Sequence, residues 1–132
     1  MKNNNEIKII PVYTYYNPGT IKAKVLKDNK NKSGIYRWNN LITGKSYIGS
    51  SINIAGRLNI YYSEKAMLSI LSTSKSIIYS AILKYGYCNF SLDILEYCEI
   101  NLLRKRKQLW KMKQTHSSKV SQASSSLPLS SS

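Results

Sequence analysis

The segments Gly34-Ile35-Tyr36-Arg37-Trp38 and Lys45-Ser46-Tyr47-Ile48-Gly49 decide the fold of this 132-residue chain. Both are rich in β-branched and aromatic residues, which favour strands. Asn39-Asn40-Leu41-Ile42-Thr43-Gly44 lies between them, and its asparagines and glycine are typical of a turn. The sequence therefore predicts a β-hairpin with Gly34-Ile35-Tyr36 on one strand and Tyr47-Ile48-Gly49 on the other.

Helices and one more strand are predicted after this hairpin. Ser51-Ile52-Asn53 offers N-cap residues for a helix that ends near Tyr62. A second helix covers residues 75–85 and stops at Gly86, with core positions at Ile77, Ile78, Ala81, Ile82 and Tyr85. In residues 90–97, Phe90, Leu92, Ile94 and Glu96 alternate with the intervening residues, and this period of two predicts a third strand. A third helix, residues 102–114, should turn Leu103, Trp110 and Met112 towards the core.

These elements, in the order β-β-α-α-β-α, predict a small α+β domain. Its core is a short three-stranded antiparallel sheet flanked by helices. Residues 1–32 are interpreted as a basic, polar leader with one short strand around residues 9–16. Residues 33–114 form the domain. Residues 115–132 are rich in serine, lack acids and show no apolar period, so we expect a disordered tail.

The charge of the chain indicates a polyanionic partner. Lys and Arg number 20 against 6 Asp and Glu, a formal net charge of +14. Nucleic acid is the favoured partner because cations displace counterions from phosphates, and an anionic membrane surface is the rival. No apolar run approaches the roughly 18 residues that span a bilayer, so no membrane insertion is expected. The 11 tyrosines suit either base stacking or core packing.

The two cysteines do not indicate a metal centre. Cys88 and Cys98 lack CxxC spacing, and the chain holds 1 His. A zinc site is therefore not expected, and both thiols are interpreted as small hydrophobic groups.

Taken together, the two tripeptides on one hairpin, followed by Arg57 on a helix, resemble the GIY-YIG nuclease superfamily. The resemblance is greatest to the homing endonucleases encoded in introns of fungal mitochondria, and it runs from about residue 11 to residue 110. It implies a metal-dependent endonuclease that hydrolyses phosphodiester bonds of double-stranded DNA. It also implies an association with a mobile intron and a mitochondrial location.

The resemblance assigns roles to individual side chains. Tyr47 would activate or orient the attacking water, with Tyr36 beside it. Arg57 would clamp the phosphate, because its planar fork suits two oxygens. Tyr61 would contact the phosphate or relay a proton, although a shift of one residue to Tyr62 is open. Each role has a structural alternative, in which the tyrosines are core aromatics and Arg57 is a surface arginine.

Three further positions support this expected site. A tyrosine with a pKa near 10 is a poor base at neutral pH, so a cation must stabilise its phenolate. Lys45 is a candidate for this task together with Arg57, or else a solvated charge of the hairpin. Gly34 belongs to the motif, and Gly49 permits close backbone packing.

The expected metal site departs from the family pattern. The family holds its divalent ion, here expected to be Mg²⁺, with a glutamate on the third helix. Gln108 and Trp110 fix the register, so Lys107 stands at that position. An ammonium group cannot bind Mg²⁺, which takes oxygen ligands. Glu96 is the candidate substitute ligand, or else the Lys107 ammonium takes the place of the metal and holds the phosphate.

Three functions remain open from the sequence. The chain is an endonuclease with full or weak activity, an inactive remnant that only binds DNA or intron RNA, or an RNA-binding helper for the splicing of its own intron. We expect the chemistry to be severely impaired because of Lys107.

Overall fold

The structure is a computed structural model that describes the backbone of residues 10–124 and the side chains of residues 10–114. The elements in chain order are β1 (Tyr13–Tyr16), α1 (Lys22–Asp28), β2 (Gly34–Asn40), β3 (Ser46–Ser51), α2 (Ile54–Tyr61), α3 (Glu64–Leu71), α4 (Ile77–Tyr85), β4 (Phe90–Tyr97) and α5 (Leu103–Ser124). Short 3₁₀ turns lie at Pro18–Thr20, Tyr87–Asn89 and Ile100–Leu102. The predicted α+β class is confirmed.

The sheet has four strands where three were predicted, in the order β1-β4-β2-β3. All neighbouring strands are antiparallel. The additional strand is β1, which confirms the short strand predicted around residues 9–16 and pairs with β4, Tyr13 opposite Ile94. Tyr15 is buried, and the Thr14 hydroxyl donates a hydrogen bond to Asp93. These partners are distant in sequence, so local composition did not reveal that β1 completes the sheet.

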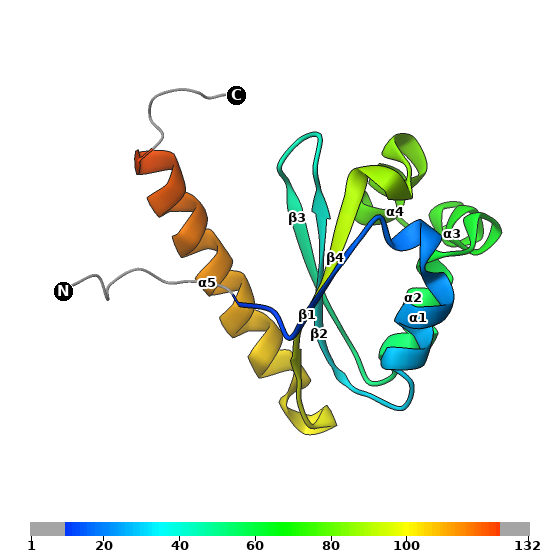
Figure 1. Cartoon of the computed structure of the whole chain (residues 1–132), viewed down its shortest axis with the longest axis horizontal. Coiled ribbons are helices and arrows are strands. Elements are labelled where there is room, and N and C mark those ends of the chain that lie inside the picture. Colours follow the sequence, from blue (N-terminus) through cyan, green and yellow to red (C-terminus); the bar gives the residue numbers. More distant parts are fainter. Residues whose placement is uncertain (1–9, 125–132) are drawn as a thin grey trace.

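Helices cover both faces of this sheet (Figure 1). Helices α1 to α4 lie on one face over a large core that includes Trp38, Leu58 and Phe90. Helix α5 crosses the other face over a smaller core of Ile35, Leu95, Leu103 and Trp110. Residues 90–95 of β4 are consequently buried on both faces.

An irregularity between β2 and β4 decides which face several side chains occupy. Ile35 lies opposite Glu96, but the next residue, Tyr36, lies opposite Ile94. Such a bulge adds one residue to β4 and breaks its strict alternation. Glu96 therefore shares the α5 face with Ile35, whereas alternation predicted it on the face of Ile94. Gly34 lies beside the bulge, where an added Cβ would collide with the carbonyl oxygen of Glu96.

The N-cap residue of α4 decides where this helix begins and which of its side chains are buried. Ser76 is the N-cap of α4, and its side chain accepts a hydrogen bond from the Tyr79 amide. Ile77, which was predicted to face the core, is thus in the first turn and 74% exposed, while Tyr79 is buried. The prediction for Met112 was also wrong, since it is 65% exposed on the outer side of α5.

Two helices were not predicted, and one is longer than predicted. α1 has no side-chain cap, and α3 is capped by the Ser63 hydroxyl. α5 continues to Ser124, through ten residues that were predicted to be disordered. Neither Gly nor Pro occurs between Leu103 and Ser124 to end it. Residues 125–132 of the predicted tail lie outside the described residues. None of the described helices combines the length and apolar character of a membrane span.

Candidate nucleic-acid site at the edge of the sheet

Strand β2 and helix α2 bring Tyr36 and Tyr61 into direct contact. Their hydroxyl oxygens are 3.0 Å apart and share a hydrogen bond. The Tyr61 ring also packs against Trp38 and Tyr79, each with ring centroids 5.1 Å apart. Tyr36 is 2% exposed and Tyr61 is 5% exposed. Two of the predicted site residues therefore meet in a buried aromatic cluster below the surface.

Gly49 has a specific reason to lack a side chain. It lies opposite Tyr36 across the hairpin, and the phenol ring lies over it. An added Cβ would lie 2.5 Å from the ring carbon Cζ and from the hydroxyl oxygen of Tyr36. Position 49 thus sets the place of the Tyr36 ring, and through it the Tyr36–Tyr61 hydrogen bond.

We expect Gly49→Ala to lower the free energy of unfolding by about 1–3 kcal/mol, as overpacking does. The Tyr36 ring must shift because the Cβ occupies its place. Chemical denaturation measures the loss. Tyr36→Leu in the Gly49→Ala background should recover part of it, because leucine leaves room for the methyl group. Simple additivity of the two substitutions would contradict this packing argument.

Burial controls the ionisation of this tyrosine pair. It raises the pKa of Tyr36 and of Tyr61 above the ordinary value, and Arg57 offsets only part of this effect. Both hydroxyl groups are therefore protonated at neutral pH. They can donate or accept a hydrogen bond, but the structure does not favour a phenolate at either one.

The other two tyrosines in question have different surroundings. Tyr47 is half-buried on β3 and lies opposite Trp38, so it shares a sheet face with Tyr36. Tyr62 points away, and its hydroxyl donates a hydrogen bond to the carbonyl oxygen of Pro18 at 2.8 Å. Of these two neighbouring tyrosines, Tyr61 is accordingly the one that contacts Tyr36.

Arg57 is the cation whose charge acts on this tyrosine pair, and it also acts on α5. Arg57 is exposed in the first turn of α2, which follows β3 directly. Its charge acts on the hydroxyls of Tyr36 and Tyr61 and also on the ammonium of Lys107 in α5. Burial, and then the charges of Lys111 and Arg57, lower the pKa of Lys107. Lys45 is exposed at the hairpin turn, and its charge is not among those that act on Lys107 or on the tyrosine pair.

The carboxylates of the sheet are engaged elsewhere. Glu96 lies on the α5 face, where one oxygen accepts hydrogen bonds from Arg106 Nε at 2.9 Å and Trp110 Nε1 at 2.6 Å. This arrangement argues against Glu96 as a substitute metal ligand beside Tyr36, because the sheet separates the two. Asp93 is buried and holds Arg37 through Nε at 2.9 Å and Nη2 at 2.6 Å.

The residues around Arg57 and Lys107 do not fit a Mg²⁺ ion. Such an ion needs at least one or two carboxylates in addition to water. Among the described residues, His, Cys, Asp and Glu side chains form no group of three or more that could hold a metal. The charges of Arg57 and Lys111 both act on Lys107, and three such cations suit an anion.

Sequence reasoning missed three residues of this region. Tyr79 completes the aromatic cluster, while Lys75 and Lys111 line a groove beside Tyr47. The spacing of Lys107 and Lys111 was a usable signal, since residues four apart share a helix face. Lys75 precedes α4, and no periodic pattern marks it.

The chain is similar in sequence to a known protein. Over 94 residues the chain is 35% identical to a Neurospora crassa protein named "Probable intron-encoded endonuclease bI1". The chain is related to part of an intron-encoded endonuclease. The aligned residues make up 70% of this chain, which spans 20% of that protein's length. No protein-family model matches the chain, and no solved structure matches it.

Proposed function

We propose that this chain is a DNA-binding domain of the GIY-YIG homing-endonuclease type whose cleavage chemistry is severely impaired. The observation that carries the proposal is the position of Arg57, whose charge acts both on the hydrogen-bonded Tyr36–Tyr61 pair and on Lys107 of α5. Two cations from different helices repel each other, and a phosphate between them would remove that repulsion. The relationship to an intron-encoded endonuclease supports DNA as the source of the phosphate.

Each side chain then has a defined task. Arg57 presents a guanidinium that binds two phosphate oxygens. Lys107 supplies a second positive charge from the opposite side. Tyr36 and Tyr61 stay protonated and position their neighbours through the shared hydrogen bond. Tyr47 is the tyrosine of the motif that solvent can reach, so it is the one that can orient a water molecule.

The impairment follows from the same residues. Hydrolysis of a phosphodiester needs stabilisation of the leaving oxygen, which a divalent ion supplies in metal-dependent nucleases. Lys107 stands where the resemblance expects the ligand of that ion. Positive charge at this place favours phosphate binding and disfavours a second cation. We further propose a mobile-intron association and a mitochondrial location, both on relationship alone.

The test compares native protein, Arg57→Ala and Lys107→Met for binding and cutting of duplex DNA. Each substitution should weaken binding about tenfold or more, since a charge-assisted hydrogen bond contributes roughly 1.5–3 kcal/mol. Fluorescence anisotropy measures the affinity, and plasmid nicking with Mg²⁺ or Mn²⁺ measures the chemistry. Fast metal-dependent nicking by the native chain would disprove the impairment. Failure to bind duplex DNA would disprove the whole proposal, and a preference for intron RNA would replace DNA as the partner.

Lys107→Met should also raise stability while it weakens binding. The fold lowers the pKa of Lys107, so its charged form costs stability at neutral pH. That cost disappears as the pH rises through the lowered pKa and the lysine deprotonates. We expect Lys107→Met to gain about 0.5 kcal/mol in low-salt buffer, as removal of a like-charge pair does. A purely structural Lys107 would instead lose stability on substitution.

A further inference from the structure

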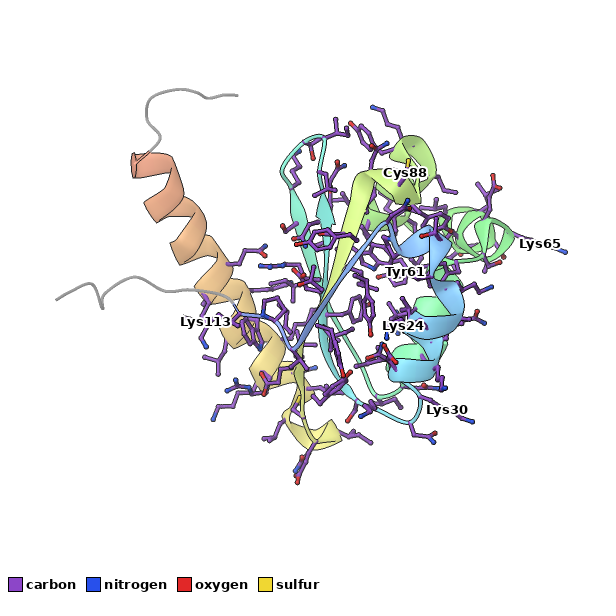
Figure 2. The ribbon with its side chains drawn as sticks, in the orientation of Figure 1. Lys24, Lys30, Tyr61, Lys65, Cys88 and Lys113 are labelled. Atoms are coloured by element: carbon purple, nitrogen blue, oxygen red, sulfur yellow. The ribbon has the colours of Figure 1, made fainter. Side chains whose placement is uncertain are left out.

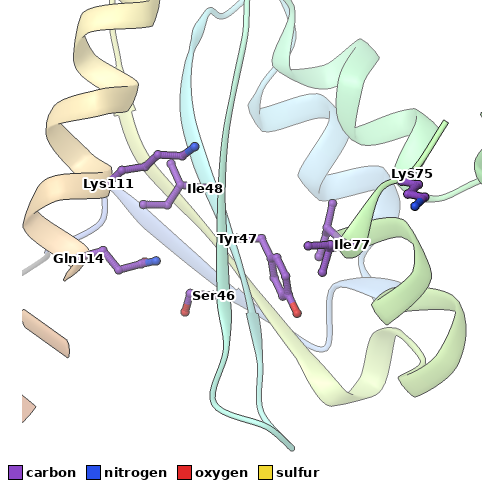
Figure 3. Close-up of a pocket in the computed structure, with 8 residues that line it drawn as sticks. Ser46, Tyr47, Ile48, Lys75, Ile77, Lys111 and Gln114 are labelled. Carbon is purple, nitrogen blue, oxygen red and sulfur yellow. The ribbon is translucent and has the colours of Figure 1, made fainter. Parts of the chain in front are cut away.

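An open groove of about 540 Å³ follows β3, which is the edge strand of the sheet. Lys75 and Ile77 line it on the side of α4, and Lys111 and Gln114 line it on the side of α5 (Figure 3). Tyr47 and Ile48 point to opposite sides of the strand between these walls. Residues of both helical layers thus meet at this edge.

The lining has a distinct chemistry. Its charged residues are two lysines, one on each wall, and it contains no acid. The strand contributes the half-buried ring of Tyr47, and Ile77 adds an apolar surface that is 74% exposed. A strand of nucleic acid presents the matching surfaces, with phosphates for the lysines and sugar and base faces for the apolar groups.

The groove continues from the proposed phosphate site. Lys111 lies one helical turn after Lys107 on α5, and the charges of Lys111 and Arg57 both act on Lys107. A backbone held at Arg57 and Lys107 can therefore continue along α5 to Lys111. Helix α5 packs against β3, and Lys111 lines the groove beside that strand.

We infer that one strand of bound nucleic acid lies in this groove along β3, with phosphates held by Lys75 and Lys111. The inference rests on the proposed function and adds the path of the strand. An extended peptide could also pair with an edge strand. The two lysine walls and the net charge of +14 favour the polyanion.

The experiment measures how affinity for a 30-base-pair duplex depends on salt concentration. Lys75→Met/Lys111→Met is compared with the matched variant Lys30→Met/Lys65→Met. Figure 2 shows Lys30 and Lys65 on the side of α1 and α3, and neither residue lines the groove. Both double variants lower the net charge equally, and methionine retains most of the apolar stem. Circular dichroism confirms that each variant folds.

Each lost phosphate contact should reduce the slope of log affinity against log salt by about 0.9. We expect the groove variant to lose about 1.8 in slope and the matched variant to stay near the native value. Equal losses in both variants would overturn the inference and leave DNA binding itself intact. Absence of binding by the native chain would instead remove the proposed function on which the inference rests. Tight binding by an acidic peptide with unchanged DNA affinity in the groove variant would assign the groove to a protein partner.

Discussion

Lys107→Glu is expected to give the chain Mg²⁺-dependent nicking of plasmid DNA at a rate at least about tenfold above that of the native chain. The substitution replaces an ammonium with a carboxylate within electrostatic range of Arg57, whose charge also acts on the tyrosine pair. A carboxylate at this place attracts a divalent ion, whereas the native lysine repels one. The ion then stabilises charge on the leaving oxygen. The measurement is the rate of conversion of supercoiled to open-circular plasmid.

Two matched variants isolate the cause. Lys107→Gln removes the positive charge without supplying a carboxylate, so it should remain as inactive as the native chain. Lys105→Glu makes the same change of charge at an exposed position of α5. In the absence of a divalent ion, Lys107→Glu should bind duplex DNA more weakly than the native chain, because it loses a phosphate contact. Equal nicking by Lys107→Glu and Lys107→Gln would show that the carboxylate is not the missing element.

Asp93→Ala is expected to lower the free energy of unfolding by about 3–5 kcal/mol, the usual result of removing one partner of a buried ion pair. Asp93 is 3% exposed and accepts hydrogen bonds from Thr14, Arg37 and Asn39. It therefore links β1, β2 and β4 on the α5 face. Its loss leaves the largely buried Arg37 guanidinium without its carboxylate. Urea denaturation followed by circular dichroism measures the change.

The control for this prediction is the exposed acid Glu64. Glu64→Ala should change stability by less than about 1 kcal/mol, because an exposed charge contributes little. The double variant Asp93→Leu/Arg37→Met should be less damaged than Asp93→Ala, since it leaves no unpaired charge. A loss of less than 1 kcal/mol for Asp93→Ala would mean that the ion pair does not hold the strands together.

Local patterns predicted the centre of this fold. The hairpin and the strand at residues 90–97 are dense in β-branched and aromatic residues, and the structure confirms β2, β3 and β4 there. A short strand was predicted around residues 9–16, but the place of β1 in the sheet depends on a distant partner, as α1 does. Val25 is the one residue of α1 that is buried, and Leu26 is partly buried against the same core. These two apolar residues are adjacent in a segment rich in lysine, so they give no helical period.

The candidate site, like the fold, could be predicted only in part. The motif brought attention to Tyr36 and Tyr61, and the structure places their hydroxyl groups in contact. The side occupied by Glu96 was not predictable, because alternation fails wherever one extra residue enters a strand. That residue is visible only in the pairing of Ile35 and Tyr36 with β4. Burial of the tyrosine pair was likewise not predictable, because it depends on how α2 and α4 pack, and no sequence motif indicates that packing.

The central place of β4 has a consequence for synthesis of the chain. β4 joins β1 to the hairpin, yet it is the last of the four strands to be made. Thr14 and its partner Asp93 are 79 positions apart in sequence. The hairpin can form early from local contacts, but β1 must wait, with its tyrosines unpaired, until nearly a hundred residues have been translated. A nascent chain that stalls before Phe90 would therefore present the β2–β3 hairpin with open edges and an unpaired β1 segment, both available to other chains.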